Sequence, residues 1–185
     1  MIKKISVSLL LVVCSFGINA QDVKKEVEKV TTKMDLFSSK TGTITKFIDT
    51  KLSNLKSSYS SSETRVRKIS NGSTPVYFYQ IEKEGKYANS TASIEYNDLL
   101  EVIKALVVLK QEVDKDIAVN PDYLENKFVT VDGFQIGYYV SNGKSTWYIK
   151  LEKYGSDNTL FIDSVDKIET ALIQAKEKID ELKKL

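Results

Sequence analysis

Histidine is absent from this chain of 185 residues, and cysteine occurs once, at Cys14. Protein zinc sites are built mainly from these two residue types, and serine–histidine and cysteine–histidine nucleophile pairs require a histidine. The composition therefore excludes those pairs, the common zinc sites and histidine-based acid–base catalysis. A single cysteine also leaves no partner for a disulfide within the chain.

Proline and glycine are scarce, with two and eight residues, whereas tyrosine and phenylalanine contribute ten and seven. Disordered chains show the opposite balance, because they lack the aromatic side chains that build a core. Hydrophobic residues make up 42% and charged residues 28% of the chain, which is ordinary for a globular protein. We therefore expect a folded chain of one domain, or of two small fused ones.

The chain also lacks a continuous hydrophobic run of the roughly 20 residues that a membrane-spanning helix needs. Its N-terminal apolar stretch covers residues 5–16, after a basic segment at residues 1–4 and before small and polar residues. This order is typical of a secretory signal peptide, which we expect at residues 1–21 with cleavage after Ala20 or Gln21. The alternative is an N-terminal membrane anchor.

Removal of this segment would change the composition of the mature chain. Lys3, Lys4 and Cys14 would be lost, so the 27 basic residues fall by two to 25, which equals the number of acidic residues. Lipid attachment at Cys14 is not expected, because Val13 rather than a small residue precedes it. We expect an exported protein, periplasmic or extracellular, whose mature chain has zero net charge and no transmembrane span.

Residues 22–40 are predicted to hold an N-terminal amphipathic helix. Apolar side chains recur there at spacings of three and four, at Val23, Val27, Val30, Met34 and Phe37. The positions between them are mostly Lys, Glu and Thr, so the apolar side chains form one stripe. Such a stripe packs on its own domain or on a partner, as in a coiled coil, and both remain open at this point.

Two similar successions of strands and one long helix follow. In residues 41–118 we expect strands at 43–48, 64–69, 76–82 and 90–96, with a serine-rich loop at 57–62. The helix after them should begin at a capping box of Asp98 and Glu101 and end near Asp116. In residues 119–185 we expect strands at 127–131, 134–140, 146–152 and 159–162, and a helix from Ser164.

The two successions match each other in turn, strand and helix. The turn Ser70-Asn71-Gly72 corresponds to Ser141-Asn142-Gly143. The apolar stripes of the helices also correspond at a constant offset, Leu99, Val102, Leu106 and Val113 matching Val165, Ile168, Leu172 and Ile179. We therefore predict an α+β fold of two repeated antiparallel ββββα units with long packed helices, one compact domain formed by internal duplication.

Alternation along the strands divides their side chains between two faces. The face expected to meet the helices carries Phe134, Ile136, Tyr138, Val140, Trp147, Ile149 and Leu151. The opposite, outer face mixes aromatic, charged and amide side chains, which suits a binding surface. Our candidate ligand-binding residues on it are Phe78, Gln135, Tyr139, Tyr148 and Lys150.

The order of elements in residues 43–185, two units of four strands and a helix, resembles the Whirly family of single-stranded-DNA-binding proteins. Related transcriptional coactivators form the same arrangement as a homodimer. The resemblance implies two sheets with their helices packed together, and it raises single-stranded nucleic-acid binding as a possible activity. No binding residue is transferred, because the likeness lies in element order and not in a sequence motif. The balanced charge predicted for the mature chain also lacks the basic footprint that phosphate binding requires.

Carboxylate pairs are the remaining candidates for catalysis, namely Asp163 with Asp166 and Glu82 with Glu152. Helix capping explains the first pair and solvated ion pairs with nearby lysines explain the second. We therefore expect a non-enzymatic protein without metal or cofactor, a monomer or weak homodimer that binds a protein, peptide or glycan. The alternatives are a structural protein that self-assembles through its N-terminal helix or a sheet edge, nucleic-acid binding, and a carboxylate-only hydrolase.

Overall fold

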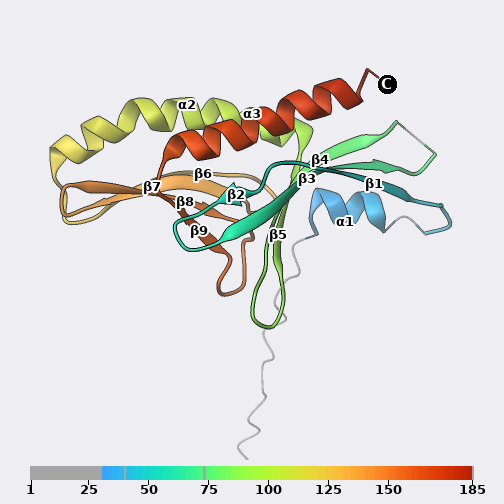
Figure 1. The fold of residues 1–185 in the computed structure, drawn as a ribbon, viewed down its shortest axis with the longest axis horizontal. Helices are drawn as coiled ribbons and strands as arrows, with labels where there is room; N and C mark the ends of the chain where they lie inside the picture. The colour runs from blue at the N-terminus through green and yellow to red at the C-terminus, as the bar shows by residue number, and fades with distance from the viewer. Residues whose placement is uncertain (1–30, 40, 73, 185) are drawn as a thin grey trace, which may run out of the picture.

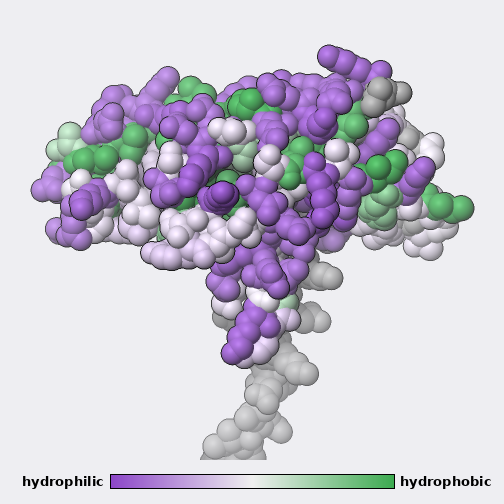
Figure 2. Space-filling model, in the orientation of Figure 1, coloured by the Kyte–Doolittle hydropathy of each residue, from purple (hydrophilic) through white to green (hydrophobic). Residues whose placement is uncertain are grey.

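The computed structural model describes residues 31–39, 41–72 and 74–184. The predicted signal peptide at residues 1–21 lies outside these residues, as do Val23, Val27 and Val30 of the predicted N-terminal stripe. Figure 1 shows two long helices on one side of the molecule, the sheets beneath them, and a short helix on the other side. The face shown in Figure 2 is largely hydrophilic, with hydrophobic residues scattered along its upper part and at both ends.

The first unit is an antiparallel sheet followed by a long helix. Its elements are β1 (Lys46–Lys51), β2 (Leu55–Lys56), β3 (Ser61–Ser70), β4 (Val76–Lys83), β5 (Ser90–Glu95) and α2 (Tyr96–Val119). The strand order is β1-β3-β4-β5, and the two-residue β2 also pairs with β3. The predicted serine-rich loop is shorter than expected, because Ser61 and Ser62 already belong to β3.

The second unit repeats this plan without a counterpart of β2. Its elements are β6 (Leu124–Val129), β7 (Gln135–Ser141), β8 (Lys144–Lys150), β9 (Thr159–Ile162) and α3 (Val165–Leu182), with the strands in sequence order. Between β7 and β8 the backbone turns through Asn142 and Gly143, whose φ angles of 52° and 68° suit a tight hairpin. The structure confirms the α+β fold: two antiparallel sheets, each followed by a long helix.

Two predicted boundaries at α2 are wrong. The N-cap is Glu95, whose side chain accepts a hydrogen bond from the Asn97 backbone, whereas Asp98 lies inside the first turn. The Asp98 carboxylate instead forms an ion pair with Lys33, a long-range contact that the local capping pattern does not reveal. At the other end α2 continues past Asp116 to Val119, and the left-handed backbone of Asn120 terminates it.

The first strands of both units are also displaced from their predicted positions. The strand expected at 43–48 is Lys46–Lys51, and the strand expected at 127–131 is Leu124–Val129. Strand pairing decides these limits, since Lys46 lies opposite Ser70 and Leu124 lies opposite Val140. The register of the strands depends on segments that are distant in the sequence, so the local alternation of residue types predicts it poorly.

One hydrophobic core joins the two units. The helices lie over the inner faces of the sheets (Figure 1), and side chains of α2 such as Leu106 share a buried cluster with Leu172 of α3. Tyr138 and Trp147 pack within it with ring centroids 4.9 Å apart. The predicted inner face of the second unit is confirmed, since all seven of its residues are buried in this cluster. No helix in the described part of the chain has the length and hydropathy needed to cross a membrane.

The short helix α1 (Lys33–Ser38) lies on the outer side of the first sheet (Figure 1). Its N-cap Thr32 has an extended backbone with ψ of 162°, so in the described residues the predicted N-terminal helix is confirmed only from Lys33 onwards. The Phe37 ring meets the Phe78 ring edge-on, with centroids 6.2 Å apart. The Lys33 ammonium lies 2.6 Å from Asp98, and the Lys33 backbone N–H donates to the Asp132 carboxylate at 3.1 Å.

Replacing Phe37 by alanine should lower the free energy of unfolding by about 1–2 kcal/mol, because the edge-on contact with Phe78 and its buried area are lost. Leu36→Ala is the matched control, since Leu36 on the same helix is 58% exposed. Urea unfolding of the two variants measures the difference. Equal stability of both would mean that α1 contributes nothing to the first sheet.

Candidate binding face

The outer face of the second sheet is the surface on which most of the candidate residues lie. We define this outer face by the side chains that point away from the helices: Glu125, Lys127, Val129, Gln135, Gly137, Tyr139, Thr146, Tyr148, Lys150, Thr159 and Phe161. Helix α1 packs on the corresponding side of the first sheet, but no described helix covers this one (Figure 1). Val129 is 47% and Phe161 39% exposed.

Tyr148 lies across the middle of the outer face. It is opposite Gly137 on β7, and its hydroxyl donates to Glu125 on β6 at 2.6 Å. The Tyr148 side chain passes over β7 at Gly137 to reach Glu125, and the glycine has no side chain that would obstruct the ring. Burial, together with the hydrogen bond to Glu125, raises the pKa of Tyr148 well above its usual value. The same hydrogen bond, with that from Lys127, lowers the pKa of Glu125.

Two tyrosines stack at the end of this face. Tyr123, just before β6, lies against Tyr139 of β7 with ring centroids 6.1 Å apart and an angle of 22° between the rings. Tyr123 is 63% exposed, while Tyr139 is half-buried beneath it. The pair offers a large, rigid apolar surface whose phenolic groups can form hydrogen bonds.

The structure places four of the five predicted residues on this face, Gln135, Tyr139, Tyr148 and Lys150. Tyr148 is buried within the face, with 6% of it exposed. Phe78 does not join them, because it belongs to the first sheet and is fully buried. Alternation placed Phe78 on an outer face correctly, but Phe37 of α1 covers it. Phe78 is therefore inaccessible to a ligand in this structure.

No protein-family model, curated protein or solved structure matches this chain. The order of strands and helices is consistent with two successive ββββα units.

Sequence reasoning missed Tyr123 and Phe161, which are accessible aromatic side chains at two edges of the outer face. Phe161 alternates with the buried Leu160 and Ile162 in a correctly predicted strand, so alternation alone could have found it. Tyr123 precedes the observed strand and contributes through its contact with Tyr139. Only the tertiary structure shows that contact.

The outer face of the first sheet carries ion pairs beside the segment that α1 covers. Both Nε and Nη2 of Arg67 donate to Asp49, at 2.7 and 2.6 Å, and this pairing lowers the pKa of Asp49. Arg65 donates to Gln80 at 2.8 Å and to Glu82 at 2.5 Å. These guanidinium groups are matched by neighbours on the same sheet, so they form a structural network rather than a free cationic surface.

The carboxylates considered for catalysis are each held by separate partners. Asp163 pairs with Lys167 at 2.7 Å, Asp166 lies in the first turn of α3, and Glu152 accepts a hydrogen bond from the Thr91 backbone at 2.7 Å. Within the described residues, no group of three or more potential ligands is placed to hold a metal ion.

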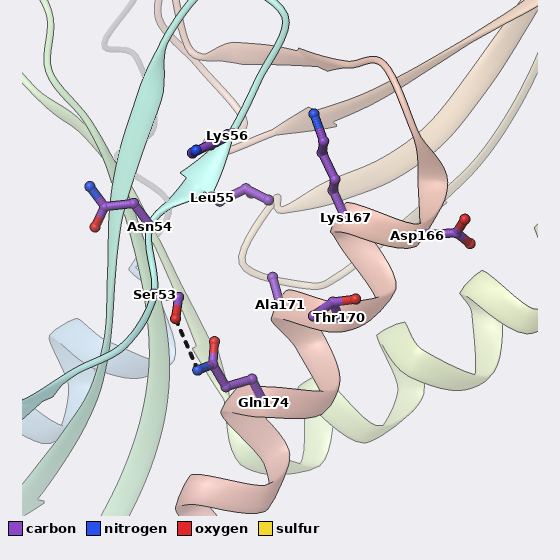
Figure 3. A pocket seen from close by; sticks show the side chains of 9 residues that line it. All are labelled: Ser53, Asn54, Leu55, Lys56, Asp166, Lys167, Thr170, Ala171 and Gln174. Carbon is purple, nitrogen blue, oxygen red and sulfur yellow. Dashed lines mark hydrogen bonds between the residues drawn. The ribbon is translucent and has the colours of Figure 1, made fainter.

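A groove of about 300 Å³ lies between β2 and the first half of α3 (Figure 3). Leu55 and Ala171 contribute its apolar surface, and Asn54 and Thr170 add polar groups. The Gln174 amide donates to the Ser53 hydroxyl at 3.2 Å across one end. Nothing in the structure indicates what would occupy this groove.

Proposed function

We propose that this protein is an exported, non-enzymatic binding protein that recognises a protein or peptide partner through the outer face of the second sheet. The observation that carries the proposal is an asymmetry between two similar units. In the first unit α1 and a network of ion pairs occupy much of the outer face, and the Arg67 guanidinium lies over the half-exposed ring of Phe47. In the second unit the stacked pair of Tyr123 and Tyr139 and the ring of Phe161 remain there, and no helix in the described residues covers them.

The chemistry of the face favours a macromolecular surface as the ligand. A sheet face is broad, and tyrosine is enriched at protein interfaces because it joins a large apolar area to a hydrogen-bonding hydroxyl. Tyr123 and Tyr139 would form the apolar centre of the contact. Gln135 and Lys150, both half-buried, would contribute polar contacts beside them, and Tyr148 would hold Glu125 in place.

Single-stranded nucleic-acid binding is the second candidate, and it corresponds to the finer resemblance to the Whirly family. The stacked pair of Tyr123 and Tyr139, with Lys127 and Lys150 on the same face, is the observation that favours it, since bases stack on aromatic rings beside cations. The equal numbers of acidic and basic residues expected in the mature chain weigh against it, because phosphate neutralisation supplies much of the affinity.

Photo-crosslinking tests the location of the binding surface. Benzoylphenylalanine placed at Phe161 should give a discrete adduct in an envelope extract, whereas the same group at Tyr87 should not. Tyr87 is a suitable control because it is 90% exposed and lies between β4 and β5. Unlabelled protein should compete for the adduct, and a Tyr139→Ala competitor should be about tenfold weaker, as expected for loss of a central aromatic contact.

Three results would contradict this assignment. Equal crosslinking from positions 161 and 87 would mean that the outer face of the second sheet is not the contact surface. Equal competition by the wild-type and Tyr139→Ala proteins would remove the tyrosine stack from the interface. Binding of an oligothymidylate that weakens steeply with added salt, and is lost in Lys150→Glu, would favour the nucleic-acid candidate.

A further inference from the structure

Strand β6 has one free edge. It pairs with β7, and in the described part of the chain no other strand lies beside it. The Thr130 N–H donates to the Phe134 carbonyl at 2.9 Å, and the β6–β7 register continues from this pair. Because hydrogen-bonded and non-hydrogen-bonded pairs alternate in an antiparallel ladder, Glu125, Lys127 and Val129 direct their backbone groups away from β7, towards the free edge.

These three residues, whose backbone groups face the free edge, restrict the register in which a second copy of β6 could pair antiparallel with the first. Only registers that place odd-numbered residues opposite odd-numbered residues join the free backbone groups. A two-fold axis at Glu125 would oppose two carboxylates, and an axis at Lys127 would oppose two ammonium groups. An axis at Asn126 instead sets Glu125 of each copy opposite Lys127 of the other.

The register about Asn126 also matches the apolar side chains of the strand. On the outer face it sets Tyr123 opposite Val129, which are 63% and 47% exposed in the single chain. On the inner face it sets Leu124 opposite Phe128, both partly buried against the core. Cross-strand pairs of opposite charge and of apolar side chains are the interactions that stabilise antiparallel sheets.

We propose that the protein forms a two-fold dimer by antiparallel pairing of β6 with β6 of a second copy, centred on Asn126. The two second sheets then form one continuous eight-stranded sheet, and their outer faces become one surface. Strand β1, the edge strand of the first sheet, is less suitable. The Leu52 N–H donates to the Thr64 carbonyl, so by the same alternation the residues whose backbone groups face the free edge are Phe47, Asp49 and Lys51. The register that uses all three opposes two Asp49 carboxylates.

Charge reversal at the edge provides the first test, with sedimentation equilibrium of the purified protein over a concentration series. Lys127→Glu should raise the dissociation constant of the dimer about tenfold or more, because each copy then opposes like charges across the strands. The double variant Glu125→Lys/Lys127→Glu should restore it to within about twofold, since the charges are exchanged and still complementary. Lys46→Glu, on the edge strand β1, should leave the dissociation constant unchanged.

A disulfide provides the second test, and it reports the register directly. Asn126 lies opposite itself at a non-hydrogen-bonded pair, where Cα atoms are about 4.5 Å apart, within the range that a disulfide bridges. In a Cys14→Ser background, Asn126→Cys should give a covalent dimer on mild oxidation. Lys144→Cys, an exposed position at the start of β8 in the same sheet, should remain monomeric under the same conditions.

A protein that is monomeric over the whole concentration series, and that gives no covalent dimer with Asn126→Cys, would overturn the proposal. A dimer that withstands Lys127→Glu but dissociates with Lys46→Glu would place the interface at β1 and also overturn it. If Lys127→Glu fails to fold by circular dichroism, the Asn126→Cys result decides. The inference does not depend on the proposed binding function, because no partner molecule enters either measurement.

Discussion

Replacing Leu106 by alanine is expected to lower the free energy of unfolding by about 3 kcal/mol, and to destabilise both units together. Leu106 is 2% exposed and belongs to the cluster that contains Ile136 of the second sheet and Leu172 of α3. Truncating a buried leucine removes its transfer free energy and leaves a cavity, at a typical cost of about 2–5 kcal/mol. Because the two units share one core, the loss of stability should also affect the second unit, which does not contain Leu106.

Two probes of urea unfolding check this expectation. Trp147, the only tryptophan of the chain, lies in β8 and reports the second unit by fluorescence, while far-ultraviolet circular dichroism reports the whole fold. Both transitions should shift equally in Leu106→Ala. Val107→Ala on the same helix is the control, since Val107 is 46% exposed and should change stability by less than about 0.5 kcal/mol. An unchanged Trp147 transition would show that the two units unfold independently.

Gly137→Ala is expected to cost about 2–3 kcal/mol, although it adds only a methyl group. A Cβ at Gly137 would lie 2.4 Å from the Asn126 carbonyl oxygen and 2.9 Å from the Lys127 Cα. Backbone atoms of the neighbouring strand cannot move aside as a flexible side chain can, so β6 and β7 would have to separate locally. The Tyr148 ring, which lies opposite Gly137, would also be displaced from Glu125.

Urea unfolding measures the loss, and the pKa of Glu125, followed by nuclear magnetic resonance, gives a local readout. Since the hydrogen bond from Tyr148 lowers this pKa in the wild type, Gly137→Ala should raise it towards the ordinary value. Gly72→Ala is the comparison, because its Cβ would meet nothing within 4 Å and only its φ of 79° is unfavourable, at about 1 kcal/mol. Equal costs for the two substitutions would contradict a close approach at Gly137.

The corresponding outer faces of the two similar units are built differently. A sheet covered by a helix on one face only leaves its other face to solvent or to a further layer. In the first unit α1 supplies part of that layer, through Phe37 on Phe78. In the second unit Tyr123 is exposed and Tyr139 is half-buried, while the buried Tyr148 lies opposite Gly137 and donates a hydrogen bond to Glu125.

Pairing through β6 would enlarge the proposed binding surface. Tyr123 and Tyr139 stack near the same edge that would meet a second copy, so the dimer would bring two tyrosine pairs onto one continuous sheet. A partner with two equivalent sites would then bind the dimer with higher avidity than the monomer. Lys127→Glu would weaken such a partner's binding without altering Tyr139.

Local periodicity in the sequence by itself determined the type of most elements and their inner faces. Alternation in β7 and β8 identified Tyr138, Trp147 and Ile149 as core residues, because side chains of a strand point to opposite faces in turn. Spacings of three and four identified α2 and α3, and the repetition of whole successions predicted the two similar units of sheet and helix. These features depend on neighbouring residues only, so a single sequence contains them.

The tertiary structure alone decided which outer face is available and how it is built. Phe78 and Tyr148 occupy equivalent strands, but their surroundings depend on contacts between distant segments. Phe37 covers Phe78, whereas Tyr148 extends over Gly137 to Glu125. The same holds for Asp98, whose Lys33 partner lies 65 residues away in the chain. Packing between distant segments determines which side chains are buried, how the strands pair and which charged groups form ion pairs. Local residue patterns do not contain this information.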